Sequence, residues 1–260
     1  MVKVCPLFSG SSGNSTYIEY QNRGILVDAG RNCKTILNSL AKIDVDPQKI
    51  EGILITHDHS DHTKALPVLT KKMKAPIYAT QETIDYIRFT QGELQAPMYP
   101  INGIMELAGM KISPFDTPHD AEHSVGFRIT AGERNIGYAT DLGEVTGMVR
   151  KGIEGCDLVI LESNYEERLL SVSQYPYYLK QRIKSNRGHL SNKQCAELAV
   201  ELAKTGTKRF VLSHLSSENN TPDIARQTTY AALKENGFNE NVDFTLTTAN
   251  RSDITTPIIL

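Results

Sequence analysis

Three histidines and one aspartate lie within six positions of this sequence, at His57, His59, Asp61 and His62. They form the pattern H-x-H-x-D-H, which directly follows the apolar run Gly52 to Ile55. Imidazole nitrogens and carboxylate oxygens are common ligands of divalent transition metals, and this density has no packing purpose in a water-soluble protein. The pattern therefore predicts metal binding. A surface turn that binds metal fortuitously is the weaker alternative, because the spacing is specific.

The first two histidines are expected to share one ion. Ile53 to Thr56 has the apolar character of a buried strand. Side chains two positions apart on extended backbone point the same way, so His57 and His59 should approach one ion from one side.

The aspartate and the third histidine are expected to face a second position. Asp61 and His62 should lie where the chain turns into a helix, with Thr63 as its N-cap and Pro67 inside its first turn, where a missing N–H costs little. Two ions about 3.5–4 Å apart would polarise an electrophile and generate a bound hydroxide at neutral pH. The stretch thus predicts a two-metal hydrolase.

Several other polar residues end apolar runs that are typical of strands. Asp28 ends the run GILVD, and a carboxylate there is costly to bury unless it is paired, so we expect it to orient a metal ligand from behind. Asp141 comes after the run 134–139 and could bridge two cations. Glu162 ends LVILE, where it either touches the site or caps the next segment of the chain. His214 comes after the buried run 209–213.

One histidine near residue 120 is expected to complete the cluster. His119 and His123 both come after the strand predicted at 112–115. His119 is preferred because it lies nearer the strand end, where the backbone fixes its position.

The remaining pattern predicts the elements that would hold these residues. Strands are expected at 2–8, 16–20, 24–28, 76–79, 112–115, 125–130, 134–139, 158–162 and 209–213, and helices at 34–42, 81–90, 192–204 and 222–236. The loop Ser9 to Ser15, which contains Ser12 and Asn14, is either a plain turn or a phosphate cradle, and the plain turn is favoured. The two β-rich halves could be a diverged duplication.

Length and composition indicate an ordinary α/β protein. The chain has 260 residues, 40% hydrophobic and 22% charged, and no linker divides it, so one domain over 1–260 is expected. The formal net charge of −2 provides no global attraction to nucleic acid, so such binding would need a local basic surface.

Cysteine usage and hydropathy indicate a cytoplasmic protein. Cys5, Cys33, Cys156 and Cys195 are scattered without a C-x-x-C pair, which fits reduced thiols. The first residues are too short an apolar run for a signal peptide, and no segment approaches the ~18 apolar residues of a membrane span. We expect no membrane association and no obligate protein partner.

A segment rich in tyrosine and basic residues has two interpretations of about equal weight. It contains Tyr175, Tyr177, Tyr178, Lys180, Arg182, Lys184 and Arg187. It is either a solvated helical face whose tyrosines pack on the body, or a surface that faces nucleic acid.

These motifs resemble, in order and over nearly the whole chain, those of the metallo-β-lactamase superfamily, which implies a four-layer αββα sandwich with a two-metal site at one edge. By the superfamily pattern one metal is held by His57, His59 and His119, the other by Asp61, His62 and His214, and Asp141 bridges them. The nitrogen and oxygen ligands suit two divalent ions of zinc, manganese or iron.

The stretches SGSSGN, THDHSDH, PHDA, ATDLG, GHLSN and LSHLS resemble more closely the bacterial YycJ (WalJ) group of this superfamily. That resemblance implies a nuclease with 5′ to 3′ exonuclease activity on DNA. The segment between Asp141 and His214 is too short for the inserted domain of the β-CASP relatives such as RNase J.

Once two metal sites are filled, His189 is surplus to coordination and is expected to be catalytic, together with Asp61. Ser191 is a natural N-cap, and a helix N-terminus favours anions, so Gly188 to Asn192, with Ser191 and Asn192, could hold a scissile phosphate. His189 would then protonate the leaving oxygen. The alternative is a histidine that only caps or packs the helix.

Two other functions compete with the nuclease hypothesis. The same chemistry could hydrolyse a small ester, thioester or lactone, as other superfamily members do. A non-hydrolytic di-iron redox or regulatory protein is less favoured, because the redox version needs a flavin donor for which this chain has no room.

Overall fold

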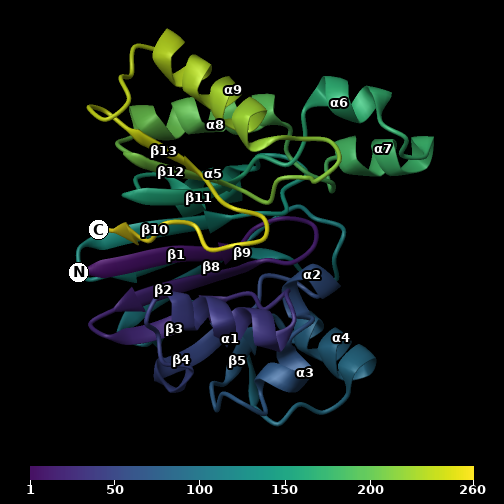
Figure 1. Ribbon diagram of the computed structural model, residues 1–260, viewed down its shortest axis with the longest axis vertical. Helices are drawn as coiled ribbons and strands as arrows, with labels where there is room; N and C mark the ends of the chain where they lie inside the picture. Colours follow the sequence, from purple (N-terminus) through teal and green to yellow (C-terminus); the bar gives the residue numbers. More distant parts are fainter.

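Two seven-stranded sheets lie face to face, and the computed structural model describes all residues, 1–260. The first sheet has the strand order β14-β1-β2-β3-β4-β5-β6. Its strands are β1 (Val2–Phe8), β2 (Ser15–Tyr20), β3 (Arg23–Val27), β4 (Ile50–Leu54), β5 (Ile77–Ala79), β6 (Met98–Pro100) and β14 (Ile258–Ile259). The C-terminal strand β14 pairs with β1, so both chain ends lie on one side of the molecule (Figure 1).

The second sheet has the order β13-β12-β11-β10-β9-β8-β7. Its strands are β7 (Met105–Leu107), β8 (Met110–Asp116), β9 (Val125–Ala131), β10 (Arg134–Ala139), β11 (Leu158–Glu162), β12 (Arg209–Ser213) and β13 (Thr245–Thr248). From β1 to β6, two antiparallel pairings are followed by three parallel ones, and the same series runs from β8 to β13. The two halves of the fold therefore repeat one pairing pattern, as a diverged duplication would.

Helices cover the outer face of each sheet. They are α1 (Cys33–Lys42), α2 (Ser60–Thr63), α3 (Leu66–Leu69), α4 (Gln81–Gln91), α5 (Gly147–Ile153), α6 (Glu167–Val172), α7 (Tyr177–Lys184), α8 (Asn192–Lys204) and α9 (Pro222–Glu235), with one 3₁₀ turn, η1 (Pro47–Lys49). Figure 1 shows α1, α3 and α4 on one side of the sheets and α8 and α9 on the other. None of the helices has the length and apolar character needed to cross a bilayer.

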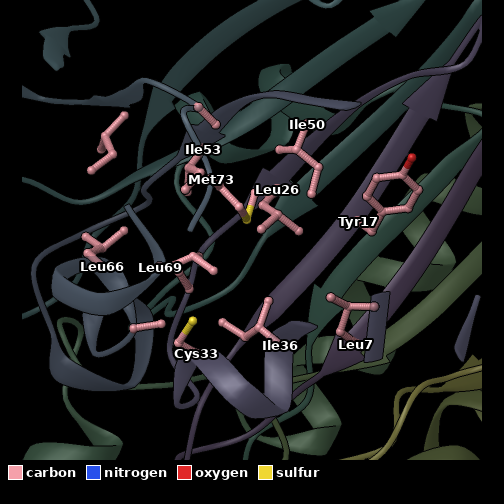
Figure 2. Packing of buried hydrophobic residues seen from close by; sticks show 14 of the residues in the cluster. Leu7, Tyr17, Leu26, Cys33, Ile36, Ile50, Ile53, Leu66, Leu69 and Met73 are labelled. Atoms are coloured by element: carbon pink, nitrogen blue, oxygen red, sulfur yellow. The ribbon is translucent and has the colours of Figure 1, made fainter. Parts of the chain in front are cut away.

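Three apolar layers hold these elements together. Figure 2 shows the layer between the first sheet and its helices, where Ile36 of α1 and Leu69 of α3 pack with Leu26 of β3. A second cluster joins α5, α8 and α9 to the second sheet, and a third lies between the two sheets. Burial of apolar surface at about 25 cal/mol per Å² is the main stabilising contribution in such layers. The predicted four-layer αββα sandwich is therefore confirmed.

Two local expectations around the metal motif are wrong. The strand that precedes it is β4, Ile50–Leu54, and not Ile53 to Thr56. Beyond Leu54, the Thr56 amide donates to the Asp28 carboxylate at 2.9 Å instead of to a neighbouring strand. Thr63 is the last residue of α2 and not an N-cap, because the helix begins at Ser60 and Thr63 donates its hydroxyl back to the His59 carbonyl.

Candidate metal centre

The polar residues singled out in the sequence gather at the edge where the parallel strands end, near α2 and α7 (Figure 1). This edge receives Asp28 after β3, the segment 56–62 after β4, His119 after β8, Asp141 after β10, Glu162 at the end of β11 and His214 after β12. The carboxyl ends of parallel strands meet at one edge of a sheet, which is where ligands bind in open α/β sheets. Two stacked sheets that end together therefore build one site.

Three of these residues have a backbone conformation that is unusual for residues other than glycine. The φ angles of Asp28, Asp141 and His214 are 65°, 60° and 54°. This left-handed region costs of order 1–3 kcal/mol per residue and persists only where the surroundings enforce it. The strain at three strand ends of one site marks positions where side-chain direction is constrained.

Two sets of ligand atoms converge as expected. The ligand atoms of His57, His59 and His119 lie within 4.8 Å of one another, and His59 Nδ1 is 3.3 Å from His119 Nε2. A second set with the same spacing is made of Asp61, His62 and His214, and a third joins His57, His62 and Asp141. Asp141 therefore lies close to histidines of both triads, at 3.7 Å from His119 and 3.4 Å from His214.

Four histidines of the centre have their Nδ1 atoms occupied by the protein. Nδ1 donates to Thr56 Oγ1 in His57 (3.0 Å), to Asp28 Oδ2 in His62 (2.8 Å), to the Gly188 carbonyl in His119 (3.0 Å) and to Glu162 Oε1 in His214 (2.9 Å). A hydrogen bond at Nδ1 fixes the tautomer and leaves the Nε2 lone pair for a metal. His59 is the exception, because its Nδ1 faces the cluster.

Asp28 makes the contacts expected of a residue that orients a ligand. It is fully buried, and its carboxylate accepts hydrogen bonds from His62 Nδ1 and from both the amide and the hydroxyl of Thr56. The Thr56 hydroxyl in turn accepts the His57 Nδ1 proton. One buried carboxylate thus controls the orientation of two histidines.

The donor set fits divalent cations. His57 Nε2 and Asp141 Oδ2 are buried and have no hydrogen-bond partner, an arrangement that native proteins avoid unless another group satisfies the atoms. Burial, and after it the neighbouring histidines, hold the pKa of His57 well below its usual value. The neutral imidazole is the form that binds metal, so the site is prepared for a cation with nitrogen and oxygen ligands.

In the second triad the pKa values of the histidines are raised, whereas the pKa of His57 in the first triad is lowered. Burial lowers the pKa of His214, but Asp141 and then hydrogen bonds to Asp61 and Glu162 outweigh it and raise that pKa to about 10. Burial likewise opposes protonation of His62, while Asp28, Asp61 and Asp141 raise its pKa well above the usual value. A cation that binds this triad therefore displaces protons held there by carboxylates.

Glu162 is a functional residue whose role the sequence left open. It is fully buried, and its Oε1 accepts the Nδ1 protons of His189 at 2.8 Å and His214 at 2.9 Å. Its Oε2 accepts the amides of Leu142 and Leu190. Its position at a strand end, like those of the two aspartates, was the signal available in the sequence.

His189 belongs to neither triad, but its ligand atom lies within 4.8 Å of those of Asp141, Glu162 and His214. Its Nδ1 is bound to Glu162 and lies 3.7 Å from Asp141 Oδ1, and its side chain is 19% exposed. Nε2 has no protein partner and is accessible. The ring is therefore oriented by the protein at one nitrogen and open at the other.

The side chains of Ser191 and Asn192, the candidate substrate contacts, are both buried and make hydrogen bonds inside the protein. Ser191 caps α8 in a capping box with Gln194, and the Asn192 amide bonds to Ser163 and Asn220. Burial depends on the tertiary packing of the helix start, which its local sequence does not reveal.

The candidates in the Ser9 to Ser15 loop have different positions. Asn14 is also buried; its carbonyl oxygen accepts the Gly10 amide and its Nδ2 donates to Asp61 Oδ2 at 3.2 Å, so it positions Asp61. Ser12 is exposed and remains a candidate for substrate contact.

Three basic residues of α7 and the loop that follows it contact the protein itself. Lys180 donates to the carbonyls of Ser171 and Ser173, and Arg187 donates to the carbonyl of His119. Arg182 forms an ion pair with Asp120. These three cations therefore have partners within the protein. Tyr177 and Tyr178 are 77% and 74% exposed, so they do not pack on the body as one of the two interpretations proposed.

His123 lies outside the cluster, as expected from the choice of His119. Its ring bonds to Glu82 at 3.2 Å and to Asp116 at 3.0 Å. These contacts join the first turn of α4 to the end of β8.

Two open clefts lead to the centre. They measure about 500 and 510 Å³, and both are lined by Asp58, His59 and Tyr86. Their walls are mainly polar, which suits a charged substrate better than an apolar one.

Comparisons with known proteins agree with this geometry. A family model described as "Beta-lactamase superfamily domain" matches residues 23–215. The chain is 34% identical over 247 residues to exodeoxyribonuclease WalJ of Streptococcus pneumoniae, covering 93% of this chain and 92% of that protein. It is 31% identical over 235 residues to exodeoxyribonuclease YycJ of Bacillus anthracis, covering 89% of each. Among solved structures, the metallo-beta-lactamase fold protein YhfI from Bacillus subtilis has a TM-score of 0.74 at 17% identity, over 98% of this chain and 99% of that one.

Proposed function

Because this chain belongs to the metallo-β-lactamase superfamily and to its YycJ and WalJ group, we propose that it is an exonuclease that degrades DNA in the 5′ to 3′ direction. Superfamily membership and the His/Asp clusters make it a metal-dependent hydrolase. The names of the relatives support nucleic acid as the substrate.

The proposal assigns one divalent cation to His57, His59 and His119 and a second to Asp61, His62 and His214, with Asp141 between them. When bound, such cations supply Lewis acidity and activate water at neutral pH. The remaining work falls to side chains of the protein. Asp61, held by Asn14, accepts a hydrogen bond from the attacking water.

Hydrolysis in this scheme forms one bond and breaks one bond at the scissile phosphate. The water oxygen forms a bond to phosphorus and passes one proton to the Asp61 carboxylate, the P–O3′ bond breaks, and the departing O3′ takes a proton from Nε2 of His189. Glu162 holds the ring by its Nδ1 proton, so Nε2 is aimed consistently. The products are a nucleotide with a free 3′-hydroxyl and a strand with a new 5′-phosphate.

The observation that carries the proposal is the position of His189 beside two converging triads. A ring that is bound at Nδ1, free at Nε2 and 3.7 Å from the Asp141 carboxylate is placed to serve a substrate at the centre. Phosphodiesters need such an acid, because an alkoxide is a poor leaving group.

The test uses duplex and single-stranded DNA and RNA labelled at the 5′ or the 3′ end, each incubated with zinc, manganese or magnesium. We expect the 5′ label to be released first as a short product while the 3′-labelled strand shortens progressively. Internal cuts at early times, or release that begins at the 3′ end, would contradict the direction. Turnover of a lactone or thioester with no cutting of any nucleic acid would favour the small-molecule hydrolase.

A further inference from the structure

A third cavity, lined by His189, adjoins the open clefts. It measures about 190 Å³ and is more enclosed than the clefts. Arg182 also borders one cleft and Asp120 the other, so the ion pair of these two residues lies between the cavity and the clefts.

The walls of this cavity combine an aromatic ring, aliphatic side chains and polar groups. Tyr175 is the aromatic residue, and Leu179 and Ile183 of α7 are aliphatic. The polar side is made of Ser11, Asn164 and Ser216. The side-chain Nδ2 of Asn164 donates to the His214 carbonyl, and the side-chain oxygen Oδ1 of Asn164 accepts no hydrogen bond from the protein. A planar group with polar edges matches such walls.

Basic residues in and after α7 hold in place the backbone that forms this wall of the cavity. Lys180 ties α7 to the end of α6 through the carbonyls of Ser171 and Ser173, and Arg187 ties the following loop to His119. A Cβ at Gly188 would lie 2.3 Å from the carbonyls of Arg182 and Ile183, so only glycine lets the chain pass this close to α7. The cavity is thus formed by pinned backbone, which favours a preorganised binding site.

We propose that this cavity holds the base of the terminal nucleotide, with Tyr175 as its stacking partner. The inference rests on the proposed function and deepens it. In the proposed hydrolysis, His189 protonates the leaving O3′, and the cavity lies on the His189 side, so its occupant is the leaving nucleotide. The cavity is smaller than the roughly 300 Å³ at which drug-sized pockets begin, so it admits one nucleoside and excludes a base pair.

The arrangement explains exonuclease action in steric terms. The strand that continues beyond the scissile phosphate lies in the open clefts, while the cavity has room for one unit only. A strand without a free end would have to continue through the wall formed by α7. In this proposal the size of the cavity sets the product length, and single nucleotides are released.

Direct binding tests the cavity independently of DNA cleavage. We would titrate the metal-loaded protein with a deoxynucleoside 5′-monophosphate and with deoxyribose 5-phosphate, which lacks the base. Base stacking predicts that the nucleotide binds about 5- to 100-fold more tightly. Tyr175→Ala should abolish this preference and Tyr175→Phe should keep it. Tyr178→Ala, on the exposed face of the neighbouring helix α7, is the matched control and should leave it unchanged.

A substrate test gives the second readout. The natural protein should cut DNA with an abasic terminal nucleotide more slowly than intact DNA. Tyr175→Ala should cut the two substrates at the same low rate. Equal binding of the nucleotide and its abasic analogue by the natural protein would overturn the assignment. If the protein cuts no DNA but binds the nucleotide with the Tyr175-dependent preference, the proposed function fails while the cavity assignment stands.

Discussion

His189 and His214 donate their Nδ1 protons to the same oxygen of Glu162, at 2.8 and 2.9 Å. The first histidine is the proposed acid and the second is a proposed metal ligand. Because the other Glu162 oxygen accepts two backbone amides, the carboxylate is fully used and its orientation is fixed. Proton donation and metal binding are thus connected through one buried side chain.

Glu162→Gln should weaken both proton donation by His189 and metal binding by His214. An amide has one acceptor oxygen, so its NH₂ group must face either the two imidazole donors or the two backbone donors. We expect metal affinity to fall about 10- to 100-fold, the usual effect of losing a group that orients a ligand. Metal titration and elemental analysis measure it.

Glu201→Gln is the matched control, because Glu201 pairs with Arg150 on an exposed face of α8. It should leave metal affinity unchanged. If Glu162→Gln binds metal normally and loses only turnover, Glu162 serves His189 alone.

His189→Ala should lower DNA turnover by about 10²- to 10⁴-fold, the range for loss of a general acid. The loss should be much smaller with a p-nitrophenyl phosphodiester, because p-nitrophenolate leaves without a proton. Bound metal should stay as in the natural protein. Equal losses on both substrates would show that His189 positions the phosphate and does not protonate the leaving group.

The sequence was sufficient for most of the long central strands, because they depend on local periodicity, whereas the short edge strands β6, β7, β13 and β14 were not predicted. The buried run at 158–162 and the strand at 209–213 match β11 and β12. The end of β4 was misplaced, because a side chain distant in sequence, Asp28, takes the Thr56 amide out of the ladder. Such a contact has no local signature.

The substrate side was the least predictable part. Asn192 looked like a surface residue at a helix start, but its bonds to Ser163 and Asn220 bury it. Lys180 and Arg187 looked like free cations, but backbone carbonyls take their protons. Charge and residue type are visible in a sequence, whereas the partner that satisfies them depends on how distant segments pack.

Asp141→Ala should lower bound metal from about two ions per chain and abolish hydrolysis, because this carboxylate lies between the two triads. The fold should persist, since the apolar layers do not include this residue. Elemental analysis and circular dichroism measure the two effects. Two tightly bound ions with normal turnover in this variant would rule out a bridging role.

The contact between β8 and α4 should make stability depend on pH through His123. The hydrogen bond to Asp116 raises the pKa of His123; partial burial opposes this, and the hydrogen bond to Glu82 adds to it. A pKa raised by folding stabilises the protein fully below the unfolded value of about 6.5, and the contribution is lost as the pH rises through the folded value.

The melting temperature of His123→Gln should therefore be lower than that of the natural protein at pH 6. This difference in melting temperature should disappear by pH 8.5. We expect a difference of about 1–3 °C at the lower pH, because the ring is 38% exposed and solvent screens its ion pairs. The metal centre titrates in the same way in both proteins, so its effect cancels when their melting temperatures are subtracted at each pH. A gap that stays constant across this range would mean that packing, and not the charge of His123, joins α4 to β8.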